Sequence, residues 1–434
     1  MATKLTQRRS SNWKTPFFTI WTGQQLSWIG SAVAGFALVW WLTETTGSAT
    51  VLAMGTLVTL LPNVLLGPFV GALVDRWDRR IVMLVADSVI ALFSAWLAYL
   101  FWTDTIQIWH VYTIMLVRAI GGTFHFPAMQ ASTSLMVPDK HLPRVAGLNQ
   151  TIGGAVNIVS PPLGAFLLGI LPLHAIMGID VFTAAFAIVP LFFVHIPQPQ
   201  RVAQGTEAAP KPSLLADVRQ GLRYVVRWPG LLTICGMSTV VNFLINPAMA
   251  LVPILITKHF GGEAPQLGWM NSAWGIGLAV GGLILGAWGG FRRRIATVLM
   301  GTFGLGVGLL VIGFAPATAF PLALVGMFLA ATLNSMSSGS AFALLQQIVA
   351  PEMQGRVFTL IMSLTTGIAP LGMAIAGPVA DALGVQTWFI MGGIASVLTG
   401  VVGFLTPSIM HLEDNHKVPA PVTEAALAAT KFTG

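Results

Sequence analysis

Long apolar segments, separated by short polar stretches, determine what this chain can fold into. Six of them lie in the first half, at residues 17–42, 48–73, 81–103, 107–135, 145–170 and 175–195. Six more lie in the second half, at 230–257, 267–290, 295–314, 320–348, 357–382 and 386–407. A helix needs about 20 residues to cross a hydrocarbon core of about 30 Å. The pattern therefore predicts an all-α membrane protein with twelve transmembrane helices in two six-helix repeats.

The composition supports a membrane protein and argues against several other classes. Charged residues make up 9% of the chain, whereas soluble domains carry about 25%. The net charge of +7 does not indicate nucleic-acid binding, because the basic residues lie at the ends of apolar segments, where anionic lipid headgroups attract them. The eight histidines are scattered and no G-x-x-x-x-G-K loop occurs, so we expect no metal site, no cofactor and no enzymatic activity.

The distribution of positive charge predicts the orientation in the membrane. All but two of the 22 Lys and Arg residues lie near the chain termini or in alternate loops, the exceptions being Arg118 and Lys258. Loops rich in Lys and Arg face the cytoplasm. We therefore expect a multi-pass protein of the bacterial cytoplasmic (inner) membrane with both termini in the cytoplasm.

The long polar stretch in the middle divides the chain. We expect a cytoplasmic N-terminal segment (1–16), an N-terminal six-helix bundle (17–195), a cytoplasmic linker (196–229), a C-terminal six-helix bundle (230–407) and a cytoplasmic tail (408–434). Within the linker, residues 213–228 place apolar side chains at helical spacing between arginines. This predicts an amphipathic helix on the membrane surface, with a partner-binding helix as the alternative. The Pro- and Ala-rich tail is expected to be disordered.

Short motifs recur in the two halves. Val137-Pro138-Asp139 is matched by Ala350-Pro351-Glu352, and Pro162-Leu163-Gly164 is matched by Pro370-Leu371-Gly372. Because each half holds six predicted spans, the two repeats point the same way and are related by an axis along the membrane normal. Repeats of this kind hold their substrate site at the interface between the halves, near the midplane.

The densest group of charges lies between segments 48–73 and 81–103. It runs from Gly71 to Arg80 and has the spacing G-x-L-x-D-R-x-x-R-R. This spacing resembles the cytoplasmic loop between the second and third helices of the major facilitator superfamily, although Asp78 replaces a residue that is usually small. The resemblance implies a conformational switch made of one glycine, one acid and three arginines: Gly71, Asp75, Arg76, Arg79 and Arg80.

In the superfamily, the aspartate at the position of Asp75 meets the start of the eleventh helix when the cytoplasmic side is closed. An anion at a helix N-terminus contributes about 0.3–1 kcal/mol, which is enough to bias two states of similar energy. The alternative is that Asp75 only balances the arginines of its own loop.

Three shorter motifs narrow the resemblance. Gly23-Gln24-Gln25, Thr46-Gly47-Ser48-Ala49 and Pro370-Leu371-Gly372 are similar to stretches of bacterial macrolide-efflux-type drug exporters. This resemblance implies a monomeric drug/proton antiporter that works by alternating access, with protons as the coupling ion.

Four ionisable residues inside the apolar segments are candidates for proton coupling: Arg118, Asp180, Asp87 and His125. An arginine near the midplane costs about 2.5–3.5 kcal/mol or more, so Arg118 is expected to face a cavity or a partner. Asp180 is the proposed proton relay, with Arg118 as its partner. Asp87 is expected to pair with the nearby loop arginines. For each residue the alternative is a purely structural contact.

The resemblance implies that the first, fourth, seventh and tenth segments line the substrate cavity, and polar and aromatic side chains on the first, seventh and tenth are the candidates for substrate contacts. The candidates are Gln24, Gln25, Trp28, Asn242, Asn246, Asn334, Ser335 and Ser338. Unsatisfied polar groups facing lipid would cost several kcal/mol, so these side chains are expected to point inward. Hydrogen bonding between helices is the alternative for each of them. The weakly charged, amide-rich set fits a bulky amphipathic or cationic organic compound.

The sequence therefore predicts a secondary active efflux transporter whose partners are a small amphipathic substrate, protons and membrane lipids. A lysophospholipid or lipid flippase and a siderophore exporter are the alternatives within transport. A membrane sensor or assembly partner that does not transport is the alternative from another class.

Overall fold

The computed structural model describes residues 13–74, 76–194, 196–198, 223, 225–226, 228–349, 353–354, 357–358, 360–361 and 367–413. Within these ranges the chain is helical and contains no strand, which confirms the predicted fold class. The predicted amphipathic helix at 213–228 lies largely outside the described residues, as do Asp75 and most of the tail.

The helices follow the predicted apolar segments closely. The first half contains α1 (Lys14–Thr46), α2 (Ala49–Val74), α3 (Arg79–Trp102), α4 (Ile108–Met136), η1 (Asp139–His141), α5 (Leu142–Ile170) and α6 (Leu173–Phe193). The second half contains α8 (Pro229–Ala250), α9 (Val252–Ile254), the π-helix η2 (Leu255–His259), α10 (Ala264–Trp288), α11 (Arg294–Phe314), α12 (Phe320–Ile348), α14 (Ala369–Leu383), α15 (Gln386–Leu405) and α16 (Pro407–Met410).

Ten of the described helices are long and apolar enough to cross a membrane. Of the twelve predicted spans, α4 is not among these ten, although it has 29 residues, because polar side chains and Arg118 lower its hydropathy. The other missing span is α14, which has only 15 residues within the described part of the chain. The count of twelve spans therefore stays a prediction.

Local sequence signals set where the helices begin and end. Gly47 ends α1 with φ 55° and Gly289 ends α10 with φ 79°, a left-handed conformation that glycine adopts without a Cβ clash. Pro229 lies in the first turn of α8, where its missing N–H leaves no helical bond unmade. The bilayer supplies the rest of the constraint, because a lipid-exposed backbone must satisfy its own hydrogen bonds.

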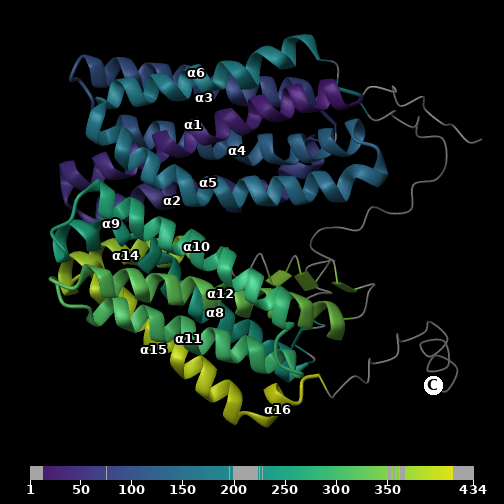
Figure 1. Cartoon of the computed structure of the whole chain (residues 1–434), viewed down its shortest axis with the longest axis vertical. Helices are drawn as coiled ribbons and strands as arrows, with labels where there is room; N and C mark the ends of the chain where they lie inside the picture. Colours follow the sequence, from purple (N-terminus) through teal and green to yellow (C-terminus); the bar gives the residue numbers. More distant parts are fainter. Residues whose placement is uncertain are drawn as a thin grey trace, which may run out of the picture.

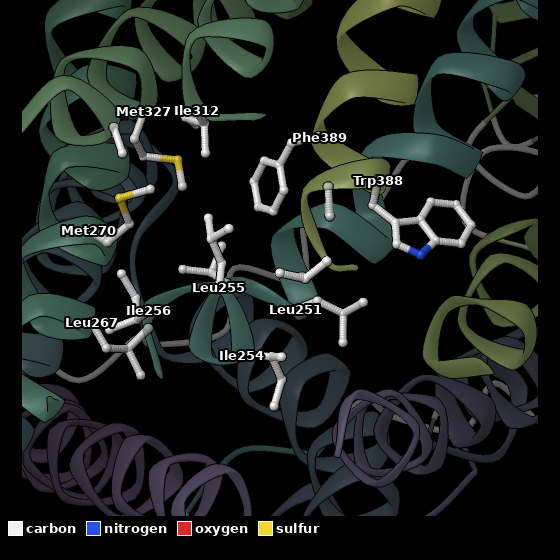
Figure 2. Close-up of a cluster of buried hydrophobic side chains, with 14 of the residues drawn as sticks. Leu251, Ile254, Leu255, Ile256, Leu267, Met270, Ile312, Met327, Trp388 and Phe389 are labelled. Atoms are coloured by element: carbon white, nitrogen blue, oxygen red, sulfur yellow. The ribbon is translucent and has the colours of Figure 1, made fainter. Parts of the chain in front are cut away.

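The helices form two bundles that follow the two halves of the chain (Figure 1). In the first, α1 packs on α5 and α6, while α3 packs on α4 and α6. In the second, α11 packs on α12 and α15, and α12 also contacts α10. The halves meet mainly through two helix pairs, α5 with α10 and α2 with α14.

The charged loop after α2 is fastened to its own half. Asp78 caps α3 by accepting hydrogen bonds from two backbone N–H groups of its first turn, the nearer at 2.9 Å from Arg80 N. This cap explains why an acid can replace the usual small residue. The Arg80 guanidinium donates to carbonyls at the end of α6, including Phe192 O at 2.7 Å. In the second half Arg293 donates to Met410 O of α16 at 3.3 Å.

The two halves touch at one end and separate at the other. We call the end that carries residues 196–198 and 411–413 the linker end. Near the middle of α5, Ser272 Oγ of α10 donates to Ile158 O at 2.8 Å, and at the opposite end Gly377 of α14 abuts α2. The ribbons of the two halves diverge toward the linker end (Figure 1).

The twelve-span prediction requires α4 to cross the membrane. In a Cys235→Ala background, Thr105→Cys precedes α4 and Lys140→Cys follows it, and both native side chains are exposed. An impermeant thiol reagent applied to intact cells should label one position, and the other should react only after permeabilisation. Labelling of both positions from the same side would remove α4 from the spans.

Candidate substrate and proton-coupling site

A cavity of about 380 Å³ lies at the interface between the two halves. It is nearer the end opposite the linker, where the halves are in contact. Its walls come from α1, α2 and α5 of the first half and from α8, α9 and α10 of the second. Pockets that bind small organic molecules have volumes of about 300–1,000 Å³. The cavity is thus large enough for a substantial part of a drug-sized molecule, at the position where the halves converge.

The cavity is apolar with a few neutral polar groups. Phe36 and Met249 contribute apolar surface from opposite halves, while Asn157, Ser160 and Asn271 contribute amides and a hydroxyl. Its described lining includes no charged side chain. The hydroxyl of Ser160 is buried, with the residue 3% exposed, and it has no hydrogen-bond partner among the described residues. Such a surface fits an amphipathic molecule that offers apolar area together with a few hydrogen-bonding groups.

Two consecutive prolines in α5 shape this part of the interface. A proline inside a helix has no N–H, so the carbonyl four residues earlier loses its helical partner. Pro162 thereby frees Ile158 O, and this oxygen accepts the hydrogen bond from Ser272 of the other half. Pro161 frees Asn157 O in the same way, next to Gly275 of α10, whose missing side chain lets the helices approach. The Ser-Pro-Pro sequence thus joins the halves through backbone carbonyls.

The predicted substrate residues on α1 lie toward the linker end from this cavity and do not line it. Gln24 is buried and its Nε2 donates to Asp87 Oδ2 at 2.8 Å, which ties α1 to α3. Gln25 holds its Oε1 buried without a hydrogen-bond partner in the described structure. Trp28 is 44% exposed, and its ring lies against Gly153 of α5.

The remaining substrate candidates also lie outside the cavity lining. The side-chain amides of Asn242 and Asn246 donate to carbonyls of their own helix, α8, at 2.9 and 2.8 Å. On α12, Ser335 packs against the glycines of α10, Asn334 is half-buried and Ser338 is exposed. Their role in binding stays a prediction. The sequence did not predict Asn157, Ser160 or Asn271 as cavity residues. The neighbouring proline pair could have indicated Asn157 and Ser160 on α5, whereas Asn271 on α10 has no such signal.

The predicted pairing of Arg118 with Asp180 is present in the structure. The Arg118 guanidinium of α4 forms an ion pair with the Asp180 carboxylate of α6 and also donates to Ser31 O at 3.1 Å. Asp180 is 1% exposed and accepts further hydrogen bonds from Ser31 Oγ at 2.8 Å and Ser94 Oγ at 2.7 Å. One carboxylate therefore links α1, α3, α4 and α6 of the first half.

A second buried network surrounds Asp87, and here the expected partner was wrong. Asp87 does not pair with the loop arginines, because its side chain points from α3 toward α1 and α4. It accepts from Gln24, and its Oδ1 lies 3.4 Å from His125 Nε2. Two of the four coupling candidates, Asp87 and His125, are thus in direct contact.

The predicted switch residues sit around the linker end of α2. Gly71 is exposed and a Cβ there would meet no atom, Arg76 is exposed in the loop, and Arg79 is 6% exposed at the start of α3. Because Asp75 lies outside the described residues, its proposed contact with the other half stays a prediction. No group of three or more potential ligands among the described His, Cys, Asp and Glu residues could hold a metal ion.

Two helical bundles around a cavity at their interface define a transporter of the major facilitator type. The chain matches the transmembrane secretion effector family over residues 12–432 and belongs to this family. It is 33% identical to Macrolide efflux protein A of Streptococcus pyogenes, over 90% of this chain and 96% of that protein. It is 27% identical to Multidrug efflux pump Tap of Mycolicibacterium fortuitum, over 88% of this chain and 94% of that protein.

Solved transporter structures share the fold at low sequence identity. A bacterial homologue of the iron transporter ferroportin superposes with a TM-score of 0.65 at 16% identity, over 89% of this chain and 97% of that one. The family and the relatives are transporters rather than enzymes. The chain is therefore a multi-pass membrane transporter of the major facilitator superfamily.

The ion pair of Arg118 and Asp180 should dominate the stability of the first half. Removing one partner of a buried pair costs about 3–5 kcal/mol, because the other charge is left uncompensated. Arg118→Met should therefore lower the thermal unfolding temperature of the purified protein markedly, and Arg118→Met with Asp180→Met should recover much of the loss. Arg292→Met, at an exposed loop position, is the control. Equal unfolding temperatures for Arg118→Met and Arg292→Met would contradict a paired buried charge.

Proposed function

We propose that this chain exports bulky amphipathic compounds, macrolides among them, by alternating access and in exchange for protons. The observation that carries the proposal is the neutral, largely apolar cavity at the seam between the halves. A macrolide presents a large apolar ring surface with hydroxyl groups and an amino sugar. The apolar wall would bury the ring, while the amides of Asn157 and Asn271 and the hydroxyl of Ser160 would meet its polar groups.

The charge distribution supports an orientation with the linker end in the cytoplasm. In that orientation the structure is inward-open, because the halves meet at the end opposite the linker and diverge toward the linker end (Figure 1). Substrate would enter from the cytoplasm or the inner leaflet and bind where the halves converge. Rocking of the halves would then close the linker end, with help from Asp75, and open the opposite end. A single working chain needs no second subunit in this scheme.

The two buried networks support different roles in proton coupling. Arg118 is always charged, so protonating Asp180 would leave a buried cation without a counter-ion. His125 Nε2 instead lies 3.4 Å from Asp87 Oδ1, so a proton gained by His125 would face a carboxylate. Histidine is the side chain that changes charge most readily near neutral pH. We therefore assign proton uptake to Asp87 and His125. Arg118 and Asp180 hold α3 and α4, the helices that carry Asp87 and His125, in their orientation.

Filling the cavity should block substrate binding without unfolding the protein. Gly35 lines the cavity, and a Cβ added there meets no atom within 4 Å, so Gly35→Phe places its ring in the space for substrate. We expect export of erythromycin from proteoliposomes to fall by about tenfold or more, equivalent to about 1.4 kcal/mol of lost binding. Gly178→Phe, on an exposed face of α6, is the matched control. Undiminished export by Gly35→Phe would place the substrate elsewhere.

Neutralising Asp87 should uncouple substrate transport from the proton gradient. Asp87→Asn keeps the size of the side chain but cannot form an ion pair with protonated His125. We expect the variant to lose accumulation of a fluorescent dye against its gradient when a pH difference is imposed, while downhill exchange continues. Asp104→Asn changes an exposed acid of the same half and should behave as wild type.

The same vesicle assay tests the proposal against its rivals. Full pH-driven accumulation by Asp87→Asn would remove this residue from coupling. Dye transport by the wild type that ignores the pH gradient would remove proton antiport altogether. No transport of any drug or dye, but movement of labelled lysophospholipid between leaflets, would favour a flippase.

A further inference from the structure

An acidic side chain joins the two halves at the end opposite the linker. Asp381 belongs to α14 of the second half, yet its carboxylate accepts hydrogen bonds from the start of α2 in the first half. The donors are Ala49 N at 3.0 Å, Thr50 N at 3.1 Å, Thr50 Oγ1 at 2.7 Å and Ser48 Oγ at 3.3 Å. Two of these donors are backbone N–H groups of the first helical turn, which have no partner within their own helix.

The same face of α14 is shaped for close approach. Gly377 lies one helical turn before Asp381, so both face α2. A Cβ added to Gly377 would lie 2.8 Å from Thr50 N and closer still to Thr50 Cα, so a side chain there would push the helices apart. The glycine lets α14 come near enough for the carboxylate four residues later to reach the backbone of α2.

We propose that Gly377 and Asp381 form the seal that closes this end of the transporter, and that it must break for substrate to leave. The carboxylate caps a helix of the other half and faces the positive end of its dipole, so the contact draws the halves together. The closure of this end does not depend on transport. Only the role of the seal in export rests on the proposed alternating access. Neither the charged loop at the linker end nor the buried networks of the first half take part in it.

The position of the seal connects it to the cavity. Leu52 and Thr56, which line the cavity, follow Thr50 within the next two turns of α2. Separation of α2 from α14 would therefore open the cavity wall on that side. Asp381 is exposed, so water can replace its hydrogen bonds when the halves part. The contact is consequently weak enough to break in each cycle, unlike the buried pair of Arg118 and Asp180.

Distance measurements between spin labels at this end test the seal directly. The labels are attached at Thr105→Cys and Ala317→Cys, in exposed loops of opposite halves, in full-length protein carrying Cys235→Ala and reconstituted in lipid nanodiscs. Loss of a helix cap typically costs about 1 kcal/mol, so Asp381→Ala should raise the ratio of the long-distance to the short-distance population about fivefold. Asp381→Asn keeps one acceptor and should give a smaller rise in the same direction.

Matched controls separate the seal from general damage. Glu263→Ala removes an exposed acid that caps α10 within its own half, at the same end of the protein, and should leave the distance distribution unchanged. Gly377→Ala should favour the open end at least as strongly as Asp381→Ala. Gly169→Ala adds a Cβ near the same end of α5, where it meets no atom within 4 Å, and should have no effect.

The outcomes decide the seal independently of transport. Unchanged distances in Asp381→Ala, Asp381→Asn and Gly377→Ala would overturn it, and so would an equal shift in Glu263→Ala. If Asp381→Ala does not fold, the Asn and Gly377→Ala variants carry the test. If the distances shift as expected while the wild type moves no drug or dye, the seal stands and the proposed export function falls.

Discussion

Contact between the two halves at one end only is the constraint on which the rest of this structure depends. Beside the cavity, α5 presents two carbonyl oxygens freed by Pro161 and Pro162. Ser272 of α10 donates a hydrogen bond to Ile158 O, and Gly275 of α10 lies against Asn157 O. These contacts are made by backbone atoms and small side chains. They let α5 and α10 approach closely without burying a large apolar surface that would resist their separation. They also define the closed end of the cavity, whose walls would separate if the halves rocked.

The buried charged networks and the cavity between the halves lie in different parts of the molecule. The networks of Asp180 and Asp87 lie within the first half, whereas the described cavity lining is neutral. Helix α1 connects the two, because Ser31 contacts Asp180 and Phe36, a little more than one turn later, lines the cavity. A change of charge in either network can therefore reach the substrate site through a shift of α1. This separation allows a transporter to accept varied drugs without placing a fixed charge against them.

The sequence was most informative where one physical rule acts on many neighbouring residues. Hydropathy predicted the helices, and the cost of burying a lone arginine predicted that Arg118 needs a partner such as Asp180. The partner of Asp87 was wrong because nearness along the chain favoured the loop arginines, whereas the facing of α3 selects Gln24 and His125. The cavity was missed because its few polar residues come from helices that are far apart in sequence and show no periodic pattern.

Alternating access requires the same two halves to close in turn at the two ends of one cavity. Distances between fluorophores at Gln150→Cys of α5 and Gly286→Cys of α10, both exposed near the linker end, measure this most directly in single molecules reconstituted in nanodiscs. Alternating access predicts a long distance in the resting protein and a second, shorter distance that grows in population when erythromycin and a pH change are supplied. One unchanging distance under every condition would contradict alternating access by this chain.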